Sequence, residues 1–217
     1  LHAFTTCPIN KQAIHDAGYP FAGHTELLAH LAGVREVAMM FLGSRWRVVL
    51  VTTHLPISEV SHWVSRDRVL KTIRLAEAGL RKFFGVNRPR LAVLGLNPHC
   101  GEEGLLGKEE REEIVPAIEE ARDSGIEVEG PYPADSFFHL SKPYPFDGVI
   151  AMYHDQGLIP VKMFGFQESV NFTLGLPFIR TSVAHGTAYD IVGKGLADPN
   201  SLIKAIVTAA NLLKVQR

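Results

Sequence analysis

Val149-Ile150-Ala151-Met152-Tyr153-His154 is a short apolar run that ends in a histidine, and the same pattern occurs at two other places in the chain. Residues 48–53 lead directly to His54, and residues 91–97 lead to His99 after one proline. Runs of this length are typical of buried strands. Because ligands bind at the carboxyl ends of strands in α/β sheets, the three histidines are expected to converge.

Longer amphipathic stretches alternate with the apolar runs, which indicates an α/β fold. Strands are expected at residues 36–42, 46–53, 90–96, 147–153 and 178–183. A helix is expected at residues 65–84, with Ser65 as its N-cap and Gly85 just past its end. A second helix is expected at 108–124, where Pro116 kinks the helix or starts a second turn and Gly125 follows. A third is expected at 200–215, capped from Asp198 or Asn200. The stretch 130–145 is too rich in proline for a central element and is predicted to be an ordered loop over a cleft.

The composition is that of one ordinary globular domain or part of a larger one, with 217 residues, 46% of them hydrophobic and 21% charged. The 22 Lys and Arg nearly balance the 23 Asp and Glu, so neither nucleic acid nor an anionic membrane is expected as a partner. Apolar runs stay below the roughly 18–20 residues that cross a bilayer.

Cysteine usage and the first residues bear on the compartment. Cys7 and Cys100 are too few for a disulfide framework, which fits a reducing compartment and predicts a cytoplasmic protein. The first residues have no initiator Met, no basic region and no long apolar region, so they do not resemble a secretory signal and are interpreted as a chain entered midway.

Three neutral imidazoles that leave one coordination position open describe a catalytic site for a divalent metal, and zinc suits three nitrogens best. Any one of His54, His99 and His154 could instead be a satisfied loop or core residue, and the residues alone leave both interpretations open. Asp135 and Asp155 are the carboxylates nearest these candidates in sequence, and either could orient a histidine or move a proton.

Two cations and an amide, Lys162, Arg180 and Asn171, could hold a phosphorylated or carboxylated substrate, although each alone could be structural. His24 and Thr25 open an expected helix after Gly23, where an anion or a hydroxyl could bind, but the pattern favours Thr25 as a simple N-cap. The glycine-rich stretch 97–107 matches neither the dinucleotide fingerprint nor the P-loop, so the cofactor-binding residues are unknown.

Taken together, these segments resemble one known family. The matching motifs are Pro8-Ile9-Asn10-Lys11, Phe21-Ala22-Gly23-His24-Thr25-Glu26, Thr53-His54-Leu55-Pro56, Leu96-Asn97-Pro98-His99, Tyr132-Pro133-Ala134-Asp135, Tyr153-His154-Asp155-Gln156-Gly157-Leu158-Ile159-Pro160, Val170-Asn171-Phe172-Thr173-Leu174-Gly175-Leu176-Pro177, Arg180-Thr181-Ser182 and Ala184-His185-Gly186-Thr187-Ala188. On these residues, which span essentially the whole chain, the sequence resembles the 4-hydroxythreonine-4-phosphate dehydrogenase family of pyridoxal phosphate (pyridoxine) biosynthesis.

The resemblance implies roles for individual residues. His54, His99 and His154 match the family's metal ligands, with zinc favoured and cobalt, manganese or magnesium still open. The positions that match its substrate-binding residues are His24, Thr25, Lys162, Asn171 and Arg180. Asp135 and Lys162 are implied as catalytic residues.

The resemblance also implies a fold and a reaction. The fold is a three-layer α/β/α sheet like that of isocitrate and isopropylmalate dehydrogenases, and residues 1–217 form a partial chain of a two-domain enzyme that lacks its N-terminal part. The family is homodimeric, with histidine ligands from both subunits in each active site. The expected oxidoreductase reaction is NAD-dependent oxidation of the substrate's C3 hydroxyl, followed by decarboxylation to 3-amino-2-oxopropyl phosphate.

Two other functions remain open on the sequence. One is a related dehydrogenase that acts on a four-carbon sugar-acid phosphate, such as threonate or erythronate 4-phosphate, and differs only around the substrate's amine. The other is a catalytically silent binding or dimerisation module, which the three retained histidines argue against.

Overall fold

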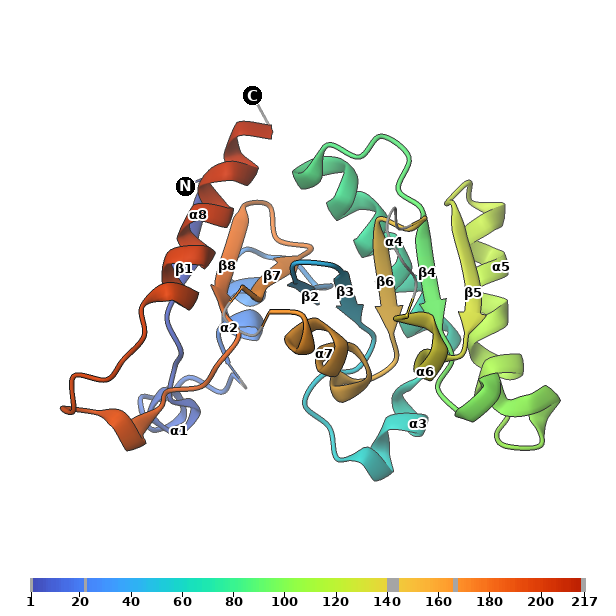
Figure 1. Cartoon of the computed structure of the whole chain (residues 1–217), viewed down its shortest axis with the longest axis horizontal. Helices are drawn as coiled ribbons and strands as arrows, with labels where there is room; N and C mark the ends of the chain where they lie inside the picture. The colour runs from blue at the N-terminus through green and yellow to red at the C-terminus, as the bar shows by residue number, and fades with distance from the viewer. Residues whose placement is uncertain (1, 22, 140–144, 166–167, 216–217) are drawn as a thin grey trace.

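The computed structural model describes residues 2–21, 23–139, 145–165 and 168–215. Within these residues, eight strands form one sheet in the order β1-β8-β7-β2-β3-β6-β4-β5 (Figure 1). The strands are β1 Ala3–Thr6, β2 Ala38–Leu42, β3 Arg47–Leu50, β4 Leu91–Leu94, β5 Val128–Tyr132, β6 Gly148–Ala151, β7 Val170–Leu174 and β8 Ile179–Val183.

The sheet has a parallel half and a mixed half. Strands β3, β6, β4 and β5 run parallel to one another. In the other half β2 pairs antiparallel with both β3 and β7, β7 pairs antiparallel with β8, and β1 runs parallel to β8. The carboxyl ends of β3, β6 and β4 therefore lie at the same edge of the sheet, as the three histidine-terminated runs predict.

Helices cover both faces of the sheet, which makes a three-layer α/β/α arrangement. On one face, α4 (Arg66–Phe84), α5 (Val115–Asp123) and α8 (Asn200–Val215) bury the larger apolar cluster, which includes Ile73 and Phe172. On the other face, α7 (His154–Met163) and α6 (Ala134–Phe137) cover a second cluster around Val48 and Leu158 (Figure 1). The shorter elements are α1 Lys11–Asp16, α2 His24–Leu31, η1 Ile57–Glu59, α3 Val60–Trp63, η2 Pro98–Gly104, the π-helical turn η3 Glu110–Ile114, and η4 Tyr189–Ile191.

The expected strands are all present, each shorter than its apolar run, and the three expected helices are confirmed. Ser65 caps α4 by accepting a hydrogen bond from the Arg68 amide at 3.4 Å, and Gly85 ends the helix with a φ of 68°. The 108–124 helix consists of η3 followed by α5, which starts beside Pro116 because proline fits the first helical turn. Asp198 accepts the Asn200 amide at 2.9 Å at the start of α8.

The prediction of a loop over residues 130–145 is wrong at its start. Gly130 and Pro131 lie in β5, an edge strand that pairs with β4, where a proline need not interrupt a hydrogen-bonded ladder. Residues 134–137 form α6, and residues 140–144 lie outside the described part of the chain.

The sequence analysis missed the strands β1, β5 and β7 and the helices α1, α3, α6 and α7. Strand β7 alternates apolar residues with Asn171 and Thr173, although all five of its side chains are buried. Helix α7 contains Gly157 and Pro160, which both argue against a helix in a pattern-based analysis. Local propensity is overridden in both elements by their packing in the sheet layers.

Gly157 is where α7 approaches the sheet most closely. A Cβ atom added there would lie 2.8 Å from both Leu50 Cδ2 and Val48 Cγ1.

Gly157→Ala is expected to lower the free energy of unfolding by about 1–3 kcal/mol, because the added methyl overpacks β3. Urea titration followed by circular dichroism measures the effect. Ile159→Ala, at an exposed position of the same helix, is the control and should change stability by less than about 0.5 kcal/mol; equal effects of the two substitutions would contradict the packing argument.

Candidate functional site

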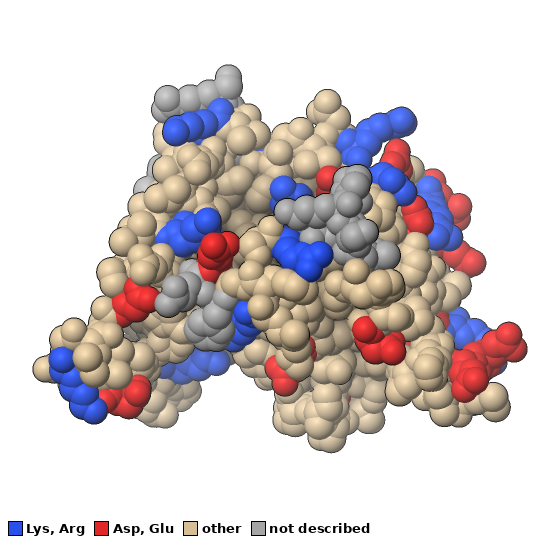
Figure 2. Space-filling view, viewed as in Figure 1, with Lys and Arg blue, Asp and Glu red and all other residues tan. Residues whose placement is uncertain are grey.

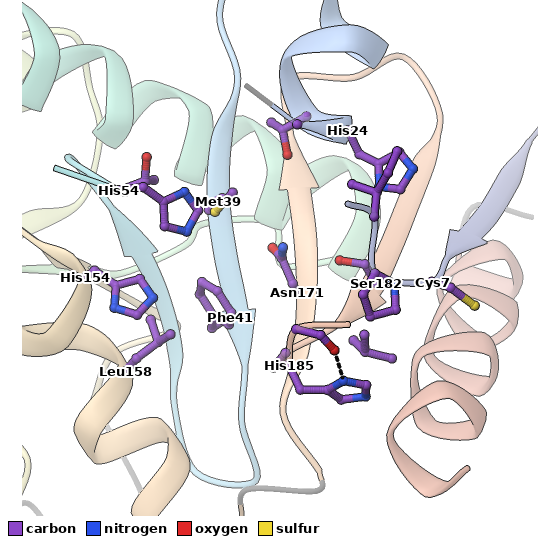
Figure 3. A pocket seen from close by; sticks show the side chains of 18 of the residues that line it. Cys7, His24, Met39, Phe41, His54, His154, Leu158, Asn171, Ser182 and His185 are labelled. Atoms are coloured by element: carbon purple, nitrogen blue, oxygen red, sulfur yellow. Dashed lines mark hydrogen bonds between the residues drawn. The ribbon is translucent and has the colours of Figure 1, made fainter. Parts of the chain in front are cut away.

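A cavity of about 740 Å³ lies on the face of the sheet that α7 covers. Successive side chains of β2 point to opposite faces of the sheet, so Met39 and Phe41 form the floor of the cavity, while Met40 belongs to the core on the opposite face. Figure 3 shows His54 and His154 on one side of the cavity, His24 on the other side, and Asn171 between them. The polar and charged residues that line it are Cys7, Lys11, His24, Thr25, Glu26, Thr53, His54, His154, Lys162, Asn171, Arg180, Ser182 and His185.

The segments that bring Lys11 and His24 to the cavity are fixed at helix starts. Asn10 caps α1 by accepting the Ala13 amide at 2.9 Å, and Lys11 follows as the first helical residue. Helix α2 starts at His24 with Gly23 as its N-cap and no capping side chain. The interpretation of Thr25 as an N-cap is therefore wrong, and its buried side chain instead lines the cavity.

Arg180 is a buried cation whose partners are neutral hydroxyls. Its side chain is 3% exposed, and it donates to Thr173 Oγ1 at 3.1 Å and to Thr6 Oγ1 at 2.7 Å. Among the described residues, Arg180 Nε and Asn171 Oδ1 have no hydrogen-bond partner. Burial lowers the pKa of Arg180 to about 10, an effect that the charge of Glu26 opposes, so the guanidinium stays protonated at neutral pH. A buried cation without a carboxylate partner is suited to binding an anion.

His54 and His154 form a pair with their ring centroids 5.7 Å apart. Zinc–nitrogen bonds of about 2.0–2.1 Å put an imidazole centroid about 3 Å from the ion, so two ligands at a tetrahedral angle have centroids roughly 5 Å apart. His154 Nδ1 donates to Asp155 Oδ1 at 2.7 Å, which leaves Nε2 free to coordinate a metal. The pKa of His54 is lowered by desolvation, then by the positive charges of Lys11 and His154, which favours the neutral imidazole. The pair fits two ligands of a divalent metal.

His99 and Asp135 do not line this cavity. His99 is exposed in η2 beyond the end of β4, and Asp135 lies in α6. Burial raises the pKa of the neighbouring thiol of Cys100, and the charges of Glu110 and Asp135 add to this effect. Within residues 2–21, 23–139, 145–165 and 168–215, no group of three His, Cys, Asp or Glu side chains could hold a metal. The structure therefore divides the predicted site residues into a cavity group and two residues outside the cavity, His99 after β4 and Asp135 in α6.

The η2 turn, which carries His99, has a rare backbone conformation. Five consecutive residues, 99–103, have positive φ angles of 52°, 53°, 77°, 43° and 57°, and only Gly101 among them is glycine. The left-handed conformation costs about 1–2 kcal/mol per non-glycine residue, so this turn stores strain on the order of several kcal/mol. Strain of this kind persists only where the surrounding structure holds it, and it clusters at functional sites.

The sequence analysis missed several residues that contribute to the cavity. Thr6 and Thr173 hold Arg180, and Lys11 and Glu26 line the cavity. Lys11, Glu26 and Thr173 stand inside the family-like motifs, so the motifs carried a usable signal. The sequence carried no signal for Thr6, because its contact with Arg180 depends on the pairing of β1 with β8.

Figure 2 shows basic and acidic side chains interspersed over one face of the molecule, in keeping with the formal net charge of -1. In the described part of the chain, no helix combines the length and apolar character needed to cross a bilayer.

Comparison with known proteins shows the family to which the chain belongs. Residues 1–209 match the family model described as pyridoxal phosphate biosynthetic protein PdxA. The 4-hydroxythreonine-4-phosphate dehydrogenase of Desulforapulum autotrophicum is 55% identical over 97% of this chain and 62% of its own length. The protein of the same name from Geobacter metallireducens is 51% identical over 99% of this chain and 63% of its own length. The chain thus spans about 62–63% of the length of these curated relatives.

Solved structures extend the comparison to the fold. A crystal structure of 4-hydroxythreonine-4-phosphate dehydrogenase from Klebsiella pneumoniae superposes with a TM-score of 0.90 at 44% identity, over 98% of this chain and 65% of that one. Isocitrate dehydrogenase from Methylococcus capsulatus is similar in fold alone, with a TM-score of 0.56 at 14% identity over 100% of this chain and 87% of that one. The expected isocitrate dehydrogenase-like fold is confirmed, and the chain belongs to the PdxA family of pyridoxal phosphate biosynthetic proteins.

Proposed function

We propose that the protein acts in pyridoxal phosphate biosynthesis as an NAD-dependent and divalent-metal-dependent dehydrogenase of 4-hydroxythreonine-4-phosphate. In this proposal it oxidises the C3 hydroxyl, and the resulting β-keto acid loses carbon dioxide to give 3-amino-2-oxopropyl phosphate. Relatives that are about half identical over nearly the whole chain bear the name of this enzyme, which supports the proposal.

The observation that carries the proposal is the buried Arg180, which forms no ion pair among the described residues, in the same cavity as the His54 and His154 pair. A phosphate or carboxylate near Arg180 could accept from the unpartnered Nε, and a substrate hydroxyl or ammonium could donate to Asn171 Oδ1. Lys162, His24 and Thr25 line the same cavity and are proposed to complete substrate binding. One small anionic molecule would then reach from Arg180 toward the histidine pair.

The metal is proposed to be held by His54, His154 and His99, with zinc favoured and cobalt, manganese or magnesium still open. When bound, such an ion would supply Lewis-acid chemistry that favours negative charge on a substrate oxygen. The chain's own contribution is to keep the His54 imidazole neutral and to orient His154 through Asp155. Proton transfer at the reacting carbon is proposed for Lys162 or Asp135. NAD would supply the hydride acceptor, and the residues that hold it are not assigned.

A second copy of the chain is proposed to supply His99 and Asp135. Both residues lie outside the cavity of their own chain, and His99 is exposed. Leu105 and Leu106, which follow η2, are 83% and 46% exposed, and exposed apolar side chains beside a strained turn suit a protein contact. This supports a homodimer in which the end of β4 of one protomer completes the cavity of its partner.

Glu26 favours the amino acid substrate over a hydroxy acid. It is the one carboxylate among the described residues that line the cavity, and within the described chain it makes no hydrogen bond or ion pair. A lone carboxylate beside cationic side chains is suited to the ammonium group of a zwitterionic phosphate ester. Threonate and erythronate 4-phosphate, which lack the ammonium, would leave Glu26 unpaired.

The proposed reaction is tested by following the absorbance of NADH with the complete protein and each of two substrates. Chelator-sensitive oxidation of 4-hydroxythreonine-4-phosphate is expected, with turnover lost in His99→Ala. Oxidation of erythronate 4-phosphate alone would transfer the protein to the related sugar-acid branch. No turnover of either substrate by metal-loaded protein would leave a silent module.

Arg180→Met is expected to abolish anion binding without destabilising the fold, because it removes a buried charge that has no ionic partner in the described part of the chain. Inorganic phosphate should raise the thermal unfolding midpoint of the parent protein and leave that of the variant unchanged. Arg88→Met, whose parent side chain is 86% exposed, is the matched control and should keep the phosphate effect. A variant that still responds to phosphate would show that Arg180 is not the anion site.

Glu26→Gln is expected to lower kcat/KM for 4-hydroxythreonine-4-phosphate by roughly tenfold to a hundredfold, because a neutral amide loses a charge-assisted hydrogen bond of about 1.5–3 kcal/mol. The kcat/KM for erythronate 4-phosphate, compared in the same assay, should stay within about twofold. Glu59→Gln, at an exposed glutamate outside the cavity, serves as control. Equal losses with both substrates would contradict recognition of the ammonium.

A further inference from the structure

Glu110 is a buried carboxylate outside the cavity, and neither the fold comparison nor the proposed reaction gives it a role. It is 4% exposed and lies in the π-helical turn η3, which follows the η2 turn. Short π-helical segments often occur at functional sites. In the described part of the chain, Glu110 has no ion pair with a basic side chain.

The hydrogen bonds of Glu110 go to the segment that leads into η2. Its Oε1 accepts from the backbone amides of Leu96 at 2.7 Å and Asn97 at 2.6 Å, and its Oε2 accepts from Asn97 Nδ2 at 3.0 Å. All three donors immediately precede Pro98 and His99. The carboxylate therefore fixes the direction in which the chain leaves β4.

The left-handed turn also packs against this carboxylate. A Cβ atom on Gly101 would lie 2.7 Å from Glu110 Oε2, and one on Gly95 would lie 3.1 Å from Glu110 Oε1. Glycines on both sides let the backbone approach the carboxylate closely. Glu110 thus contacts the start of the segment through hydrogen bonds and its left-handed part through packing.

The same segment is tied to the turn that carries His154. Gln156 donates to the Gly95 carbonyl at 2.7 Å and accepts from the Met152 amide at 2.7 Å. Movement of the η2 turn would consequently change the end of β4 and its link to α7. The exposed His99 projects from a backbone that is held at both ends and strained between them.

We propose that Glu110 is the positioning residue of His99: its carboxylate holds the left-handed η2 turn and so sets where the imidazole is presented as a metal ligand. This inference rests on the proposed function, in which His99 binds the metal. Glu110 touches neither substrate nor metal in this role.

A double-mutant cycle of Glu110→Gln and His99→Ala on the complete protein tests the inference. The readout is Zn²⁺ affinity, measured by competition with a chromogenic chelator, together with the thermal unfolding midpoint of the metal-free protein. Glu110→Gln is expected to lower Zn²⁺ affinity roughly tenfold or more in the parent and to have no further effect in the His99→Ala background. Glu112→Gln, at an exposed glutamate of the same turn, is the control and should not change the affinity.

Two results would overturn the inference, and they are distinguishable. Equal loss of affinity in both backgrounds, or a lower unfolding midpoint with unchanged affinity, would mean that Glu110 is only structural. Unchanged affinity in His99→Ala would instead remove His99 from the metal site and with it the proposed ligand set. If Glu110→Gln does not fold, Asn97→Ala replaces it, because this variant removes one of the three bonds and should lower Zn²⁺ affinity in the same direction.

Discussion

The parallel pairing of β3, β6 and β4 is the constraint on which the rest of the structure depends. Parallel neighbours bring their carboxyl ends to one edge, so turns that are far apart in sequence become neighbours in space. The His54 and His154 turns follow β3 and β6, and the η2 turn follows β4. The mixed half of the sheet then adds Met39 and Phe41 as the cavity floor and Asn171 and Arg180 as polar lining, and the cavity forms where the two halves meet.

The sequence predicts those parts of the fold whose signals are local. Apolar runs located the strands β2, β3, β4, β6 and β8, and Ser65 with Gly85 marked the ends of α4. Strand β7 was missed because its cavity face is polar, and α7 because Gly157 is needed there for close packing. Both errors occur at the site, where requirements of function and packing depart from simple patterning.

The candidate site was predictable in composition and less so in arrangement. One cavity is lined by candidate residues from five separated segments, namely His24, His54, His154, Asn171 and Arg180. His99 appeared equivalent to the other two histidines in sequence, since it also follows an apolar run. The left-handed turn that holds it away from the cavity depends on Glu110, a glutamate in a stretch that otherwise resembles the exposed face of a helix.

The alternation along β7 and β8 has a consequence for folding. Asn171 and Arg180 face the cavity, while Phe172 is buried in the core of the opposite face. Slipping either strand by one residue would put its polar side chains into the apolar core and its apolar ones into the cavity. Burying a guanidinium among aliphatic side chains is so unfavourable that the misaligned pairing is not competitive. The residues that would recognise the substrate therefore also determine the strand register of the sheet that holds them.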